Sequence, residues 1–212
     1  MEQQTAGWGQ ARSTVLGVQI ALISGVLAIV FAFVITGEQT LFNLIMSVAG
    51  VLAIITFAAG LFLLRGGAGP RASRGFLGII VSVLALLAAY TGVDPIQTSG
   101  SIWQGLDFLL VLVGDVAALI GGVLLGTSLG ALSGGSGLGK ASGYAFLVGG
   151  VFQMGAGVPD LGSIMTESTS LGDMGHILDG LAGIVFVIIG PALLYVAVRR
   201  LRAASSRKDS AA

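Results

Sequence analysis

An acidic residue inside a strongly hydrophobic stretch is the first feature of this chain that could carry chemistry. Asp115 stands in DFLLVLVGDVAALIGG, eight residues after Asp107, or about 12 Å further along a helix axis. A carboxylate in hydrocarbon is costly unless it is protonated, paired or hydrated. Every Lys and Arg falls at or beyond a membrane boundary. We therefore expect Asp115 either to form a structural hydrogen bond while protonated, or to bind a proton or cation.

A second group that could carry chemistry is Asp173, His176 and Asp179, spaced three residues apart. On a helix this spacing places the side chains roughly on one stripe, with the histidine between two acids. Histidine changes charge near neutral pH, so the pattern allows an external pH sensor or a weak divalent-metal site. We favour a simpler interpretation, in which Asp173 stabilises a helix N-terminus and His176 is an interfacial polar residue. One histidine and two carboxylates match no specific metal signature, and we predict no metal site.

The stretch SGGSGLGKAS, residues 133–142, contains the G-x-x-x-x-G-K spacing of a phosphate-binding loop. That loop requires a preceding strand, a following helix, and Ser or Thr directly after the lysine. Here Ala141 follows Lys140, and the preceding residues form too long an apolar run for a strand. We predict a glycine- and serine-rich turn between two helices and no nucleotide binding.

Other catalytic and cofactor chemistry finds no support in the sequence. The chain has no cysteine and a single histidine, so thiolate metal sites and paired histidine ligands for haem are excluded. No lysine stands within an apolar stretch, as a retinal Schiff base would need, and no glycine-flanked nucleophile elbow is present. We predict that the protein is not an enzyme, holds no cofactor and binds no nucleic acid.

The elements that position these residues follow from composition. Of 212 residues, 55% are hydrophobic and 9% are charged, against about 25% charged in ordinary soluble domains. A hydrocarbon core about 30 Å thick needs about 20 apolar residues per helix. Six stretches meet that need, and the first is too long to be a cleaved signal peptide. They are 15–36, 41–64, 75–93, 102–132, 143–158 and 177–198. The sequence predicts an all-α polytopic bundle of six transmembrane helices.

Charge gives this bundle an orientation. All ten basic residues fall on one side of the six-helix map, and the charged residues in the loops of the other side are all acidic. By the positive-inside rule the basic side is cytoplasmic, so both termini lie in the cytoplasm. We expect a multi-pass protein of a prokaryotic plasma membrane. Its parts are a cytoplasmic segment (1–14), the transmembrane domain (15–199) and a basic cytoplasmic tail (200–212).

The spans also suggest an internal repeat of three helical hairpins, 15–64, 75–132 and 143–198. The first helix of each hairpin ends near TGE, TGVD or GVPD, and the second begins near a polar residue. Those polar residues are Asn43, Asp107 and Asp179. Each hairpin starts on the same side, so the repeats are parallel, unlike the inverted repeats of many transporters.

Glycines indicate where the helices pack. Gly122, Gly126 and Gly130 are spaced four residues apart in the fourth span, and the fifth span is also rich in glycine. Small residues let helix backbones approach each other in lipid. We expect tight packing of the fourth and fifth spans, with Pro191 bending the sixth against them.

The glycine-punctuated segments ISGVLAIVFAFVITGE and LIMSVAGVLAIITFAAGLFLLRGG resemble the HdeD-type acid-resistance membrane proteins. That family is built from repeated helix pairs, with six spans and cytoplasmic termini. The resemblance implies a non-enzymatic inner-membrane protein linked to stress, with no catalytic residue to transfer.

Three functions follow from these observations. The first, which we prefer, is a non-enzymatic structural, accessory or stress-related protein that packs in the bilayer as a homo-oligomer or as a subunit of a larger membrane complex. The second is a small proton- or cation-coupled channel or carrier that uses Asp115, with Asp107 and Asp179 at its outer mouth. The third is an external pH or metal sensor that acts through His176. If Asp115 faces lipid or a partner, the first is favoured; if it faces an internal cavity, the second is favoured.

Overall fold

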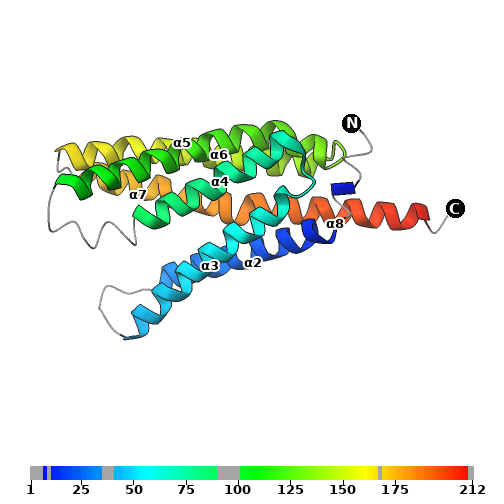
Figure 1. Ribbon diagram of the computed structural model, residues 1–212, viewed down its shortest axis with the longest axis horizontal. Helices are drawn as coiled ribbons and strands as arrows, with labels where there is room; N and C mark the ends of the chain where they lie inside the picture. Colours follow the sequence, from blue (N-terminus) through cyan, green and yellow to red (C-terminus); the bar gives the residue numbers. More distant parts are fainter. Residues whose placement is uncertain (1–6, 9–10, 35–40, 90–100, 167–168, 210–212) are drawn as a thin grey trace.

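The computed structural model describes residues 7–8, 11–34, 41–89, 101–166 and 169–209, and every element in these ranges is helical. The elements are α2 (Arg12–Val34), α3 (Leu41–Arg65), α4 (Gly69–Ala88), α5 (Ser101–Leu132), α6 (Gly137–Thr166), α7 (Thr169–Ile184), the π-helix η3 (Val185–Ile189) and α8 (Gly190–Asp209). The last three follow one another without a break and form one long rod (Figure 1). The predicted all-helical fold is confirmed.

Six helical segments of the described chain are long and apolar enough to cross a membrane, which confirms the six predicted spans. Two of the helices extend beyond the predicted spans. Helix α6 runs over Gly137–Thr166, whereas the apolar stretch covered only 143–158. Likewise α7 begins at Thr169, eight residues before the expected start of the sixth span. Both helices continue through sequence that is rich in glycine and serine. Such sequence is not hydrophobic enough to be counted in a span, but its backbone can still form helical hydrogen bonds.

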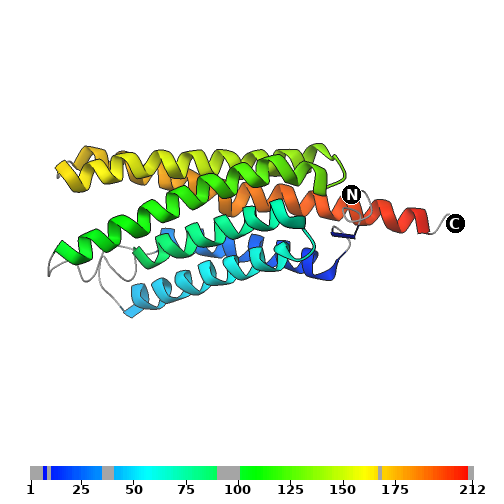
Figure 2. The ribbon, with the colours of Figure 1, turned by 45° about the horizontal axis from the view of Figure 1, so that its top comes forward.

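The helices run up and down, and neighbours in sequence pack side by side. Helix α5 packs against both α4 and α6, and α6 also packs against α7 and α8. The pair α2–α3 contacts the rest through α4, η3 and α8, and it diverges from the other helices at one end (Figure 1). The turned view separates α3, α4 and α5 and shows them as successive neighbours (Figure 2).

Helix α2 begins and α8 ends at the same end of the bundle (Figure 1). We call it the basic end, because the arginines and the lysine at these helix ends gather there; they are Arg12, Arg65, Arg71, Arg74, Lys140, Arg199, Arg200 and Arg202. The other end of the bundle is called the far end.

Glycines bring the backbones of paired helices into contact. A Cβ atom on Gly60 of α3 would lie 2.6 Å from the backbone nitrogen of Ala21 in α2. A Cβ atom on Gly78 of α4 would lie 2.8 Å from the Cα of Gly121 in α5. Real Cβ atoms do not approach so closely, so these positions accept only glycine without a backbone shift. This close packing is the expected mode of helix association in lipid.

The π-helix η3 ends two residues before Pro191. Proline has no N–H, so it cannot bond the carbonyl of Val187 four residues earlier. The chain adjusts by widening: the N–H of Gly190 donates to the carbonyl of Val185, five residues back. Gly25 of α2 lies directly against the Val187 carbonyl. The sixth span therefore changes its helix type where α2 approaches it.

Three phenylalanines link α4, α6 and η3 in the core. Phe76 and Phe146 meet edge to face with ring centroids 6.5 Å apart, and Phe146 and Phe186 lie 6.2 Å apart. All three side chains are buried. Aromatic pairs at these distances are mutually attractive and fill the interior efficiently. The middle of the bundle is thus packed with apolar side chains.

Trp8 closes the basic end. Its side chain is buried, and its indole N–H donates to the carbonyl of Leu64 at 3.0 Å. Leu64 stands in the last turn of α3, where carbonyls have no partner within the helix. We expect Trp8→Phe to lower the free energy of unfolding by about 1 kcal/mol, because it removes this one hydrogen bond and retains most of the packing. Unfolding in mixed micelles, followed by circular dichroism, measures the change; an unchanged stability would show that the bond contributes nothing.

Candidate functional site

Three polar side chains from three helices meet inside the bundle. The Gln153 amide nitrogen of α6 lies 3.2 Å from the Asp115 Oδ1 of α5 and 2.7 Å from the Asp179 Oδ1 of α7. An amide NH₂ group carries two donors, so one glutamine can bond both carboxyl groups at once. We refer to Asp115, Gln153 and Asp179 as the polar cluster.

The polar cluster lies within the spanning segments. Asp115 and Gln153 each stand five residues from the midpoints of their spans, Phe108–Leu132 and Gly137–Pro159. This is about 7.5 Å along each helix, in both cases towards the far end. Asp179 is the third residue of the span Ile177–Ser206. The cluster therefore occupies the half of the membrane nearer the far end.

Burial differs among the three side chains. Asp115 is 2% exposed and Gln153 is 6% exposed, whereas Asp179 is only half-buried. Asp115 thus faces neither lipid nor an outer surface of the bundle. Polar groups in such a place must bond one another, because hydrocarbon offers no alternative partner. The cluster joins a fully enclosed carboxyl to a partly accessible one through a single amide.

Gly157 of α6 makes room for the Asp115 carboxyl group. A Cβ atom at this position would collide with Asp115 Oδ2. Two turns earlier, a Cβ atom on Gly150 would lie 2.6 Å from the carbonyl oxygen of Ala118. These two glycines hold α6 close enough to α5 for the Gln153 amide to reach Asp115.

We expect Gly157→Ala to displace the Asp115 carboxyl group and to lower the free energy of unfolding by about 1 kcal/mol, at the low end for overpacking because a side chain can move. Gly155→Ala is the matched control, since the nearest atom to its new Cβ would be the Leu178 Cδ1 at 4.0 Å. Thermal unfolding of both variants in the same detergent measures the difference. Equal stabilities for the two variants would contradict the close fit of Asp115 against Gly157.

The structure brings together only part of what the sequence singled out. Asp115 and Asp179 meet through Gln153, which sequence reasoning did not select. Asp107, Asp173 and His176 stand in α5 and α7, but their side chains lie outside the part of the structure that is described. Among the described side chains, no group of three or more His, Cys, Asp or Glu could hold a metal ion. The outer sensor built on His176 stays a prediction.

A signal for Gln153 was present in the sequence. It is the only amide side chain in the fifth predicted span, within FLVGGVFQMGAG. Uncharged polar residues in a span often bond across helices. Asp179 was instead grouped with His176 on its own helix, whereas its described partner lies on α6.

The packing glycines occupy two environments. A Cβ on Gly122 would lie 2.5 Å from the carbonyl oxygen of Phe146, and one on Gly126 would lie 3.2 Å from the Cβ of Leu147. Both glycines therefore face α6. Gly130 faces the Lys140 side chain instead, whose Cγ would lie 2.7 Å from an added Cβ.

The phosphate-loop-like stretch is a turn only over residues 133–136, because the rest of it, 137–142, already belongs to α6. Gly134 and Gly135 have φ angles of 65° and 77°, a left-handed conformation that glycine adopts without strain. The Ser136 hydroxyl then accepts a hydrogen bond from the N–H of Gly139 at 3.1 Å and caps the start of α6. A helix rather than a strand precedes the turn, so the arrangement is not that of a phosphate-binding loop.

These observations establish a multi-pass membrane protein of six apolar helices with a polar cluster between α5, α6 and α7. No protein-family model, curated protein or solved structure matches the chain.

Proposed function

We propose that the protein is a non-enzymatic, proton-responsive membrane protein and that the polar cluster is its responding site. The observation that supports this is the bridging amide of Gln153, which donates to carboxyl groups on two other helices. A change of charge on either carboxyl group alters a contact between helices, so proton binding there has a structural consequence. The proposal combines the preferred non-enzymatic role with a response to acidity through Asp115 and Asp179.

The surroundings of Asp115 favour a proton over a larger cation. Its carboxyl group is 2% exposed, and one of its oxygens lies directly against the backbone of Gly157. A proton adds almost no volume to this site, whereas a metal cation would require several oxygen ligands around it.

The residues between the polar cluster and the basic end favour a structural response to proton binding over proton transport across the membrane. The next buried side chains in that direction are apolar, among them Ala118, Leu125 and Phe146. Three buried serines of that half are already bonded to the backbone. The Ser133 hydroxyl donates to the Leu129 carbonyl at 2.8 Å, the Ser142 hydroxyl donates to the Gly190 carbonyl at 2.8 Å, and the Ser128 hydroxyl donates to the Leu124 carbonyl at 2.5 Å. The half-buried Asp179 instead leads from the cluster towards the far end. Proton exchange with one side of the membrane suits this arrangement.

The orientation of the protein in the membrane determines which side the polar cluster responds to. By the positive-inside rule, the basic end faces the cytoplasm of a prokaryotic cell and the polar cluster lies in the outer half of the plasma membrane. The protein would then respond to external acidity, in line with the link to stress that the resemblance to HdeD-type proteins implies. Its exposed apolar faces contact lipid, further copies of the chain or subunits of a larger complex.

Infrared difference spectroscopy on the protein in lipid nanodiscs tests the proposal. The sample is titrated between about pH 4 and about pH 8, a range chosen to span ordinary carboxyl and histidine titration. We expect a protonated-carboxyl band whose intensity changes with pH and that is altered in both Asp115→Asn and Asp179→Asn. Asp209→Asn is the matched control, because it removes a carboxyl group from the last residue of α8.

Two results would contradict the proposal. A carboxyl band that does not change over the whole range would make the polar cluster purely structural. An Asp115-dependent proton flux in proteoliposomes that contain a pH-sensitive dye would instead establish the channel or carrier.

A further inference from the structure

A groove at the basic end lies between the start of α6 and the middle of α8. Its volume is about 180 Å³, and it opens to the surface. The lining comprises Ser136, Gly137, Leu138, Ala197, Arg200, Leu201 and Ala204. The turn before α6 supports one wall, since a Cβ on Gly134 would lie 3.4 Å from the Leu201 Cδ2. The groove is separate from the polar cluster and uses none of its residues.

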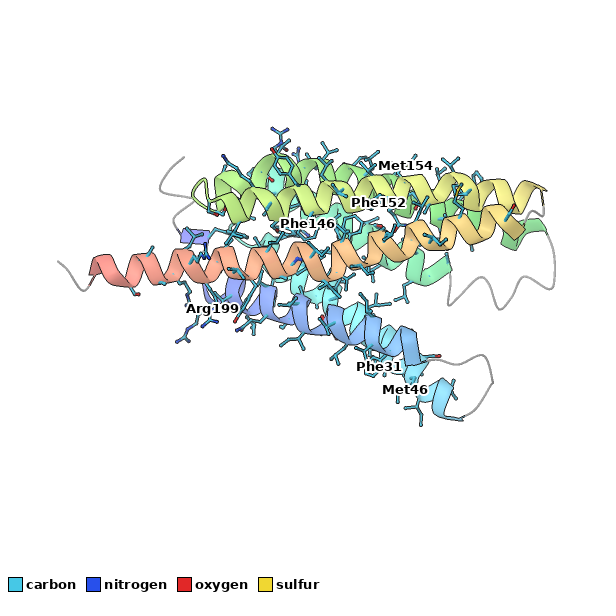
Figure 3. The ribbon with its side chains drawn as sticks, turned by 180° about the vertical axis from the view of Figure 1, so that it is seen from behind. Phe31, Met46, Phe146, Phe152, Met154 and Arg199 are labelled. Atoms are coloured by element: carbon cyan, nitrogen blue, oxygen red, sulfur yellow. The ribbon has the colours of Figure 1, made fainter. Side chains whose placement is uncertain are left out.

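The groove combines apolar walls with one cationic side chain. Almost all of its exposed lining is apolar, and Arg200 is the charged residue among the lining side chains. Arg199 and Arg202 are neighbours in sequence on α8, and the Arg199 guanidinium lies 5.7 Å from the centre of the Tyr195 ring. Figure 3 shows Arg199 on the side of the long rod that faces α2. Of these three arginines, Arg200 is the one that lines the groove.

The position of the groove in the membrane indicates what covers it. Gly137 is the first residue of one spanning segment, and Ser206 is the last residue of another. The groove lies at the first of these ends, and its α8 residues fall within the last ten residues of the second segment, close to where hydrocarbon gives way to lipid headgroups. Helix α8 continues past the other helices here (Figure 1). Basic pockets between helices on the cytoplasmic side of a membrane are suited to anionic headgroups.

We propose that this groove is a binding site for one anionic phospholipid. The acyl chain lies against Leu138, Leu201 and Ala204, and the phosphate pairs with the guanidinium of Arg200. The planar guanidinium group can bond two phosphate oxygens at once, which a zwitterionic lipid satisfies less well because it carries its own cation. The charge of Arg200 selects an anionic headgroup, and the apolar walls of the groove bind the acyl chain.

Native mass spectrometry of the delipidated protein tests this site, with phosphatidylglycerol and phosphatidylcholine added at equal concentration. We expect preferential retention of one phosphatidylglycerol, and Arg200→Gln is expected to weaken that retention about fivefold, the factor that about 1 kcal/mol per basic residue represents. Arg71→Gln is the matched control: it removes the same charge from the same end, on α4 and away from the groove. Circular dichroism in the same detergent verifies that each variant is folded.

A second variant tests the chain-binding walls. Ala204 is exposed in the groove, so Ala204→Leu fills it without disturbing the core. We expect this variant to lose phosphatidylglycerol although every charge is retained. Equal losses in Arg200→Gln and Arg71→Gln, or full retention in Ala204→Leu, would overturn the site. If inorganic phosphate displaced phosphatidylglycerol as well as free lipid does, the proposal would also be overturned, because the groove would then bind an anion without contacting an acyl chain. A dimer that Ala204→Leu abolishes would overturn it as well, because the groove would then be occupied by a second copy of the protein.

Discussion

Replacing Gln153 with methionine is expected to lower the free energy of unfolding by about 2 kcal/mol, one of the two largest effects that the structure predicts. Methionine retains much of the length and volume of glutamine but has no N–H to donate. The variant therefore removes both bonds of the polar cluster, to Asp115 and to Asp179. Single interhelical hydrogen bonds in membranes contribute about 0.6 kcal/mol on average, and a buried polar group left without a partner costs about 1–3 kcal/mol.

A double-mutant cycle separates the hydrogen bond from simple packing. Asp115→Leu alone leaves the Gln153 amide with one carboxyl partner fewer, whereas Asp115→Leu with Gln153→Met makes both positions apolar. Because replacing both partners can be nearly neutral, we expect the double variant to lose clearly less stability than the sum of the single variants. Unfolding of all four proteins in the same mixed micelles provides the measurement. Strictly additive losses would contradict the contact between the two side chains.

The same variant connects stability with the proposed response to acidity. Without the amide, α6 loses the two bonds that Gln153 makes to the cluster carboxyl groups of α5 and α7, so a change in their charge acts less strongly on α6. We expect Gln153→Met to retain a titrating carboxyl band while any change of helix packing with pH becomes smaller. Hydrogen exchange in α7 at acidic and neutral pH reports the packing. If hydrogen exchange in α7 changed with pH as it does in the unmodified protein, the Gln153 amide would not be what links carboxyl titration to helix packing.

The six spans could be predicted from the sequence because hydrophobic length is a local property. A stretch such as the one around Val111 is apolar whatever its neighbours are. The polar cluster could not be predicted, because it depends on how α5, α6 and α7 rotate and slide against one another. That register is set by backbone contacts at glycines such as Gly150 and Gly157, which depend on three-dimensional proximity. The sequence placed Asp115 inside the membrane and Gln153 in the fifth span, but it did not determine the register that makes them partners.

The sixth span illustrates a second limit. Pro191 indicates a local irregularity in any helix, and a bend was expected there. The structure resolves the lost hydrogen bond by a π-helical segment, Val185–Ile189, with Gly25 of α2 against the Val187 carbonyl. Whether a proline produces a bend or a widened turn depends on what packs beside it. Here the neighbour is a glycine on a helix more than 160 residues away in sequence.

The other large effect is expected at the crossing of α4 and α5. A Cβ on Gly121 would lie 2.9 Å from the carbonyl oxygen of Gly75, and one on Gly78 would lie 2.8 Å from the Cα of Gly121. These neighbours are backbone atoms that cannot rotate away, so Gly121→Ala must force the two helices apart. We expect a loss of about 2–3 kcal/mol in the free energy of unfolding, in the upper range for overpacking, because dispersion contacts along the whole interface weaken together.

Gly180→Ala and Gly183→Ala on α7 are the matched controls for Gly121→Ala, since a Cβ at either position would meet nothing within 4 Å. Alanine favours the helix over glycine by about 1 kcal/mol, so these variants are expected to be neutral or slightly more stable. The contrast tests the role of glycine directly, because the chemical change is identical at all three sites. If Gly121→Ala were as stable as the controls, the close backbone contact between α4 and α5 would be wrong. The arrangement that places α5 and Asp115 beside α6 would then need a different support.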